Sequence, residues 1–372
     1  MRLQLSARHW AIFLAMSTLC VTSASTQSVS AETSPAVPLI ADTTMTLVKT
    51  IQGQITPKSV RSSGAGLVSA QNMMYRHSVT IYNAKTMVLE STIPDRVKLS
   101  DFGYLKYSGS YLGAPVEGAF SPDGKYLYVT NYAMYGKGFD HEGHDDCKAT
   151  NPYDKSFLYR INLSTRAVDA IYPVGKVPKV VQVTPDNKYL LVTNWCSYDL
   201  TIISIDSGKT VKNIYIGAYP RGIVVTQDSK FAYVAHMGGN TVRRIKMSDF
   251  SDSKIYIGLN PRALVLSPDE RTIYATLNLS GKVVALDLAS KKIVHSITTG
   301  KATRSLDIST DGSALFVVNF GSATLSKIRT SDFKVTQTIK VCTQPIGITY
   351  EATQNRTWVA CYLGAIKVFD NK

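Results

Sequence analysis

The sequence predicts an all-β fold, a seven-bladed β-propeller with four-stranded blades. Three observations support this prediction. A motif recurs seven times, most copies are spaced by about forty residues, and a segment near the N-terminus can complete the last copy. Four short strands repeated at that period are typical of propeller blades.

The repeated motif consists of a Pro, often followed by Lys or Arg, an alternating run, a turn and a second run such as Tyr-Val-Thr-Asn. Its clearest copies span residues 177–195, 219–237 and 260–278. The residues that open the second runs are Leu67, Tyr128, Leu191, Tyr233, Tyr274, Phe316 and Trp358. The last five lie 42, 41, 42 and 42 residues apart, whereas the intervals of 61 and 63 hold insertions.

Each repeat contains four short runs in which apolar and β-branched residues recur at period two. In one copy these runs are 221–226, 231–236, 241–247 and 254–257. Period two is the signature of a β-strand, and Asp-Gly, Asp-Asn or Asp-Ser turns join the first pair of runs. No copy shows the 3.6-residue period of a helix, which excludes helical repeats.

The last repeat ends after its third strand, at Lys372. Residues 46–53 supply the missing outer strand, because they match the fourth strands of other repeats that end at glycine. Pairing them beside 365–369 would close the ring and cover its exposed edges.

The first 31 residues predict export. Arg2 and Arg8 precede a short apolar run at 10–21, and Val29-Ser30-Ala31 offers a small-residue cleavage site. Cys20 raises the alternative of a lipid anchor, but Thr18-Leu19 stand where small residues are expected. We therefore expect a signal peptide at 1–31, a linker at 32–44 and a propeller at 45–372. We also expect a soluble monomer that is exported to the periplasm or the extracellular space.

The segments Tyr128–Asn131 and Leu191–Asn194, each preceded by a Pro-Asp turn, resemble the YVTN-repeat β-propeller family, including the exported YncE-like proteins. The resemblance covers about residues 45–372. It implies a propeller, and a binding or surface protein more often than an enzyme, with DNA binding among the activities attributed to the family. His236, Leu277 and Cys361 replace the Asn of the motif, so a complete asparagine ring is absent from this sequence.

Five cations directly follow the Pro, or its equivalent, at the start of a first strand. First strands line the central channel of a propeller, so these cations are expected around one channel mouth. Val116 and Ile346 interrupt the series. The five residues are Lys58, Lys179, Arg221, Arg262 and Arg304.

The ends of the second strands are expected on the same face. They carry Asn131, Asn194, His236 and Asn319, beside the aromatic residues Tyr132, Trp195, Phe320 and Tyr362. Cations interleaved with aromatic rings suit a polyanion such as nucleic acid or an acidic glycan, or a small anionic ligand. The net charge of +14 favours the same partners. An alternative stays open, in which the arginines bind loop carbonyls, the asparagines cap turns and the aromatic residues pack blade against blade.

Both insertions, at 96–112 and 135–155, are expected on this face. The second contains oxygen and imidazole groups that could hold Ca²⁺ or Zn²⁺, namely Asp140, His141, His144 and Asp145, but their spacing matches no established metal loop. We predict no cofactor.

Four cysteines follow the predicted signal peptide. The fold places Cys147 near Cys196 and Cys342 near Cys361, although four cysteines allow three connectivities.

The sequence has no Gly-x-Ser-x-Gly elbow and no recognisable Ser-His-Asp order. We therefore predict a non-enzymatic module that binds an anionic ligand. One alternative is a lyase or hydrolase for a small carboxylated substrate, with His236 or Glu117 as base and Arg221 or Arg262 holding the carboxylate. Another is a scaffold for a second protein, which would present a broad apolar patch.

Overall fold

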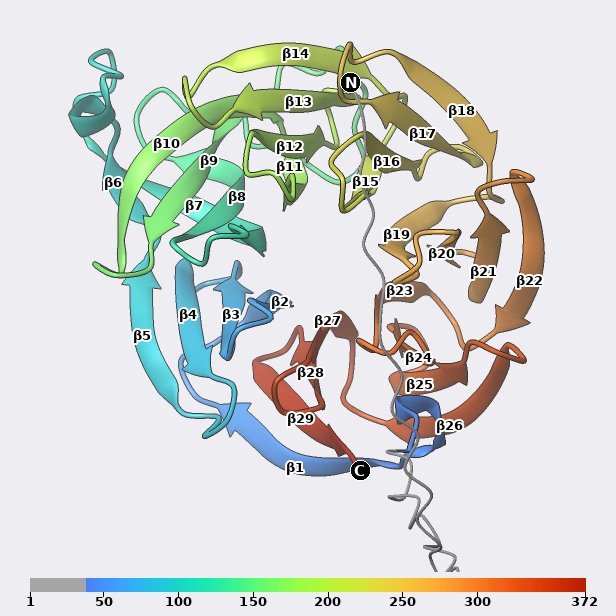
Figure 1. The fold of residues 1–372 in the computed structure, drawn as a ribbon. Helices are drawn as coiled ribbons and strands as arrows, with labels where there is room; N and C mark the ends of the chain where they lie inside the picture. The colour runs from blue at the N-terminus through green and yellow to red at the C-terminus, as the bar shows by residue number, and fades with distance from the viewer. Residues whose placement is uncertain (1–37) are drawn as a thin grey trace, which may run out of the picture. The chain divides into compact units, whose positions relative to one another are not determined.

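The computed structural model describes residues 38–372. The predicted signal peptide, Cys20 and the first part of the predicted linker lie outside the described residues. Residues 38–372 form seven antiparallel sheets arranged around a central channel (Figure 1). The predicted all-β, seven-bladed propeller is confirmed.

Within each blade, the first strand lies at the channel and the fourth lies at the rim. Blade one contains β2 (Pro57–Ser62), β3 (Leu67–Asn72), β4 (Ser78–Asn83) and β5 (Leu89–Pro94). Blade two contains β7 (Ser110–Phe120), β8 (Tyr126–Tyr135), β9 (Lys155–Asn162) and β10 (Ala167–Lys176). Blade three contains β11 (Pro178–Val183), β12 (Tyr189–Asn194), β13 (Asp199–Ser204) and β14 (Thr210–Tyr215). Blade four contains β15 (Pro220–Val225), β16 (Phe231–His236), β17 (Thr241–Lys246) and β18 (Asp252–Tyr256).

The remaining blades follow the same order. Blade five contains β19 (Pro261–Leu266), β20 (Thr272–Leu277), β21 (Lys282–Asp287) and β22 (Lys292–Thr298). Blade six contains β23 (Thr303–Ile308), β24 (Ala314–Asn319), β25 (Thr324–Arg329) and β26 (Lys334–Lys340). Blade seven contains β27 (Pro345–Glu351), β28 (Arg356–Cys361), β29 (Ala365–Asn371) and the N-terminal β1 (Met45–Gln52).

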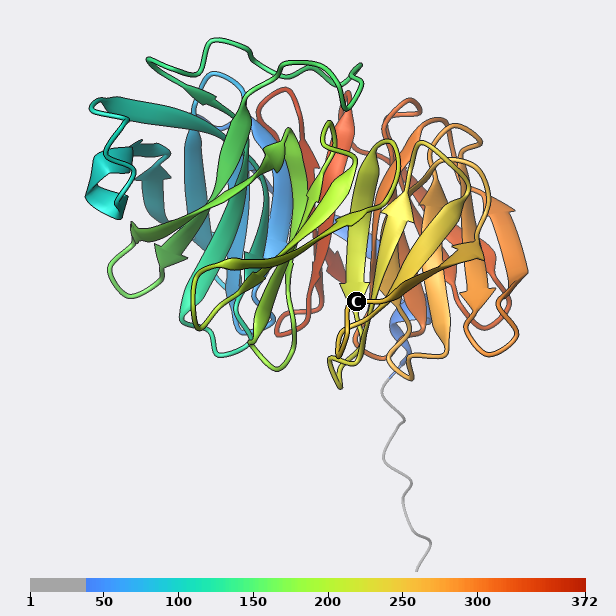
Figure 2. The same ribbon diagram turned by 90° about the horizontal axis from the view of Figure 1, so that it is seen from above.

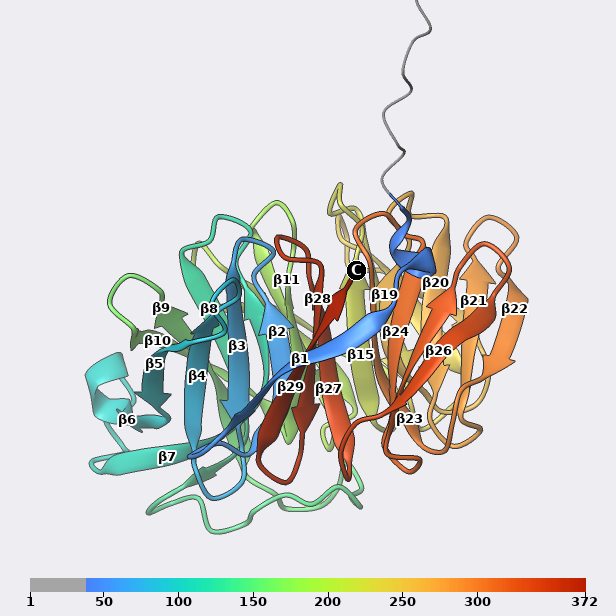
Figure 3. The ribbon, with the colours of Figure 1, turned by 90° about the horizontal axis from the view of Figure 1, so that it is seen from below.

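The ring closes through β1. This strand pairs antiparallel with β29, from Met45 opposite Asn371 to Gln52 opposite Ala365 (Figure 3). The predicted closure is confirmed. The short 3₁₀ helix η1 (Ile40–Asp42) precedes β1, and the backbone N–H of Ile40 donates to Asp311 Oδ2 at 2.9 Å. The end of the predicted linker is thus packed on the propeller, with Ile40 buried.

The core lies between neighbouring blades. One buried cluster joins Tyr233 and Val242 of blade four to Leu264 and Ala275 of blade five. The alternating pattern of each strand produces this arrangement, because the two faces of every inner strand pack against adjacent sheets.

The insertion before blade two adds a fifth strand to that blade. It forms β6 (Arg96–Lys98) and the 3₁₀ helix η2 (Leu99–Phe102), and β6 pairs with the start of β7. The segment between β8 and β9, drawn in green, runs over one face of the propeller (Figure 2). The turns between first and second strands are stabilised separately by Asp side chains, as where Ser121 Oγ donates to Asp123 Oδ1 at 2.6 Å.

Candidate functional site: a cationic central channel

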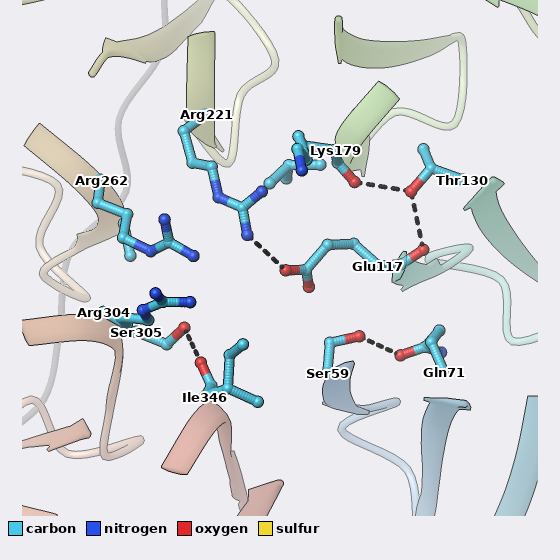
Figure 4. Close-up of polar contacts among 12 residues, drawn as sticks. Ser59, Gln71, Glu117, Thr130, Lys179, Arg221, Arg262, Arg304, Ser305 and Ile346 are labelled. Carbon is cyan, nitrogen blue, oxygen red and sulfur yellow. Dashed lines mark hydrogen bonds and ion pairs between the residues drawn. The ribbon is translucent and has the colours of Figure 1, made fainter. Parts of the chain in front are cut away.

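Arginines from the first strands of several blades surround a cavity in the central channel. Figure 4 shows Arg221 of β15, Arg262 of β19 and Arg304 of β23 converging with Glu117 of β7. The cavity has a volume of about 80 Å³, and Arg61 of β2 also lines it. Among the described residues that line it, four are arginines and Glu117 is the single acid.

The arginines are incompletely neutralised. Arg221 forms an ion pair with Glu117, with Nη2 to Oε1 at 3.3 Å. Arg262 has its Nη1 3.7 Å from the Sδ of Met237, a weak acceptor. The guanidinium carbon of Arg304 lies 3.6 Å from the ring centroid of Phe320, and its Nε has no hydrogen-bond partner among the described residues. Arg61 donates from Nη2 to Gln182 Oε1 at 3.0 Å, across the channel from blade one to blade three.

Burial and mutual repulsion shift the pKa values of these cations. Burial lowers the pKa of Lys58 well below its usual value, and Arg221, Arg262 and Lys179 lower it further. Burial, with Arg221 and Arg304, also lowers the pKa of Arg262. A cluster of like charges in a low-dielectric channel is costly, and a bound anion would relieve this cost.

The predicted rim cation Lys179 is buried beneath two aromatic rings and one carboxylate. Its Nζ lies 4.2 Å from the ring centroid of Tyr132 and 5.2 Å from that of Trp195. It also forms a 2.6 Å ion pair with Asp145 Oδ1, which comes from the segment between β8 and β9. The Nζ of Lys58 lies 5.9 Å from the ring centroid of Tyr362. Three of the five predicted cations thus lie against predicted aromatic rings, and Lys58 and Lys179 are not among the described residues that line the arginine cavity.

The predicted asparagines do not join them. Asn194 is fully buried; its Oδ1 accepts from the backbone N–H of Gly175 at 2.9 Å, and its Nδ2 donates to Asp199 and Thr201. Asn319 is also fully buried and hydrogen-bonds Thr303 and Ser326. Both asparagines are thus used in hydrogen bonds that hold the propeller together, so we remove Asn194 and Asn319 from the candidate ligand contacts.

Asn131 and His236 are likewise held outside the cavity. Asn131 is fully buried, and a Cβ on Gly113 would stand 2.5 Å from its Oδ1. His236 packs between Gly217 and Gly239, where a Cβ on either glycine would lie 2.5 Å from the ring. Burial lowers the pKa of His236, with Arg243 and Lys254 adding to the effect. Neither side chain is among the described residues that line the cavity.

Comparisons with known proteins agree with this architecture. A profile of the YNCE-like beta-propeller family matches residues 149–231. Antigen Lp49 of Leptospira interrogans serogroup Icterohaemorrhagiae serovar copenhageni (strain Fiocruz L1-130) is 24% identical over 169 residues. That match covers 43% of this chain and 37% of the antigen, so the chain spans well under half of that relative. These matches support a YncE-like β-propeller.

A solved structure shares the fold of this chain. Virginiamycin B lyase from Staphylococcus aureus, solved as the selenomethionine-substituted protein, superposes with a TM-score of 0.67 at 14% sequence identity. The match covers 88% of this chain and 99% of the lyase. At that identity the similarity concerns the fold alone.

Two disulfides join the predicted cysteine pairs. Cys147 is bonded to Cys196, and Cys342 to Cys361. The candidate metal ligands Asp140, His141, His144 and Asp145 do not converge, since residues 38–372 contain no group of three or more His, Cys, Asp or Glu side chains placed to hold a metal ion. Asp145 instead binds Lys179. Within the same residues, no helix has the length and hydropathy needed to cross a membrane.

Sequence reasoning missed Arg61 and the role of Asp145. Arg61 lies in the most degenerate repeat, three residues after Lys58, where the motif offers no signal for a cavity residue. Asp145 lies in an insertion without a counterpart in other repeats, so periodicity could not place its side chain.

Proposed function

We propose that this propeller is a non-enzymatic module that binds a small anion, or one anionic group of a larger ligand, in its central channel. The excess of four arginines over one carboxylate around the cavity supports the proposal. Guanidinium groups donate in pairs to planar carboxylates and to phosphates, and they remain charged at any physiological pH.

The size of the cavity narrows the class of ligand. A volume of about 80 Å³ is small for a ligand site, since pockets for drug-sized ligands usually measure about 300 to 1,000 Å³. An anion such as phosphate or a short carboxylate suits this space, whereas a nucleic acid or acidic glycan could engage only the rim.

Two further features support binding without turnover. Glu117 is paired with Arg221, and His236 does not line the cavity among the described residues. The lyase alternative therefore loses His236 as its base, and its other candidate base, Glu117, is engaged by Arg221. The disulfides support our proposal that the protein is exported to an oxidising compartment.

The decisive experiment is calorimetric titration of the protein with inorganic phosphate over a salt series. The site variant is Arg221→Gln, Arg262→Gln, Arg304→Gln. The matched control is Lys209→Gln, Lys212→Gln, Lys292→Gln, which removes three exposed positive charges in or directly before outer strands. Both variants lose the same net charge, so general electrostatic attraction is held equal.

We expect the wild-type protein and the control to bind phosphate, with an affinity that falls as salt rises, and the site variant to lose binding by at least about 100-fold. Equal binding by both variants would show that the channel is not the site. Single-stranded DNA in the same assay tests the rim: tight binding that survives the site variant would favour a polymer ligand.

A further inference from the structure

We propose that Lys179, Tyr132 and Trp195 form a second subsite, specific for a carboxylate, and that Asp145 occupies it in the free protein as a tethered competitor. This inference rests on the proposed function, because the subsite adjoins the arginine cavity. The rim of the channel then binds a separate carboxylate group of the ligand, and Asp145 lowers the affinity for that group.

Asp145 already contacts the subsite as a ligand carboxylate would. Its Oδ1 accepts from Lys179 Nζ at 2.6 Å and from the Tyr132 hydroxyl at 3.2 Å. The Lys179 side chain is 3% exposed, whereas that of Asp145 is 72% exposed. A buried ammonium thus meets a carboxylate that approaches from solvent, so an external carboxylate could reach the same position along the same path.

The backbone of Asp145 is held independently of its carboxylate. Trp195 Nε1 donates to the Asp145 carbonyl at 2.8 Å. Two residues later, Cys147 is bonded to Cys196, and its carbonyl accepts from Tyr198 and Tyr219. The segment is therefore fastened to blade three and the start of blade four. Rotation of the Asp145 side chain alone would vacate the subsite, with no movement of the segment.

The chemistry of the subsite favours a carboxylate over a phosphate. Lys179 supplies one cation, Tyr132 supplies one hydroxyl donor, and the two aromatic rings exclude water on the sides. One cation and one neutral donor balance a singly charged group, whereas a doubly charged phosphate matches the arginines of the cavity. A ligand that carries an anionic group for the cavity and a carboxylate for the rim would engage both.

A tethered competitor weakens the observed affinity of any external ligand for its subsite. If the competitor occupies the subsite nine-tenths of the time, the apparent dissociation constant is raised about tenfold. Removing the Asp145 carboxylate therefore strengthens the binding of an external carboxylate, although Asp145 itself contacts Lys179 and Tyr132.

The experiment follows binding of propionate by the indole N–H resonance of Trp195, in wild type, Asp145→Ala, Asp145→Asn and the control Asp146→Ala. Asp146 is the neighbouring exposed acid, so the control changes the net charge equally. Titrations are run from pH 5 to pH 7, because the pKa of Lys179, which burial lowers to about 7, is raised by Asp145 and falls when Asp145 is removed; affinities are compared for the form in which Lys179 is protonated. Phosphate is titrated in parallel as the probe of the arginine cavity.

We expect both Asp145 variants to bind propionate about tenfold more tightly than wild type, and Asp146→Ala to match wild type. Unchanged or weaker propionate binding, with phosphate binding intact, would overturn the competitor role and leave the proposed function standing. Absence of binding for both probes in every variant would overturn both. A gain of the same size in Asp146→Ala would assign the effect to net charge and also overturn the inference.

Discussion

Asn194 has the residue type expected at a ligand-binding face, yet its amide serves the blade. The side chain joins Gly175, at the end of blade two, to Asp199 and Thr201 in the third strand of blade three. Full burial leaves no water to replace these partners. The amide of Asn194 thereby ties the end of blade two to the third strand of blade three.

We expect Asn194→Ala to lower the free energy of unfolding by about 2 to 4 kcal/mol, because it leaves the buried N–H of Gly175 and the carboxylate of Asp199 without their hydrogen-bond partner. Asn240→Ala, at an exposed turn, serves as the control and should change stability by less than about 0.5 kcal/mol. Urea denaturation measures both. Equal stability of the two variants would contradict the structural role of the amide.

At the scale of single residues, the sequence predicted some residues of the site and missed others. Residue spacing placed Arg221, Arg262 and Arg304 on first strands, and the structure brings them together. Spacing could not show that Asn194 and Asn319, which recur just as regularly as these arginines, are buried inside the fold. A period-two pattern reports which face of a strand a side chain occupies, and not how far it lies from the channel. Arg61 and Asp145 lack a repeat signal altogether.

At the scale of elements, the segment between β8 and β9 is the least regular part of blade two and is fastened by a disulfide. Cys147 and Cys196 are separated by 49 positions, whereas Cys342 and Cys361 are separated by 19. The first bond crosses from blade two to blade three, and the second stays within blade seven. The entropy that each bond removes from the unfolded chain grows with the length of chain it closes.

Cys147→Ser, Cys196→Ser should therefore lower the free energy of unfolding by about 4 kcal/mol, and Cys342→Ser, Cys361→Ser by about 3 kcal/mol. Guanidinium denaturation under identical conditions compares the two double variants. A larger loss for the shorter loop would show that native contacts, and not loop length, govern these bonds.

For the whole molecule, the dominant feature is positive charge that is partly buried. The net charge is +14, and burial lowers the pKa of Lys179 to about 7. Arg221 and Arg262 contribute to this lowered pKa and Asp145 opposes it, while Lys58 adds a buried like charge. Between about pH 7 and the usual lysine pKa near 10.4, the unfolded chain binds more protons than the folded one. Stability then rises with pH.

We expect the melting temperature at low salt to increase from pH 7 to pH 9, by an amount equivalent to about 2 kcal/mol from Lys179. Lys179→Met removes the titrating group and should flatten this rise, while the exposed control Lys209→Met should retain it. Parallel profiles for wild type and Lys179→Met would contradict the assignment. Thermal melts by circular dichroism are sufficient.

The pairing of β1 with β29 also determines when the propeller can finish folding. Met45 becomes available early in synthesis, but its partner Asn371 is made 326 residues later, which is 371 minus 45. Blades can form in order from local contacts, whereas closure needs a contact between the two ends of the sequence, which slows folding. During that delay β1 is an unpaired strand, and Lys49 within it discourages pairing with other chains. β1, which closes the finished ring, is therefore also the strand whose pairing is completed last.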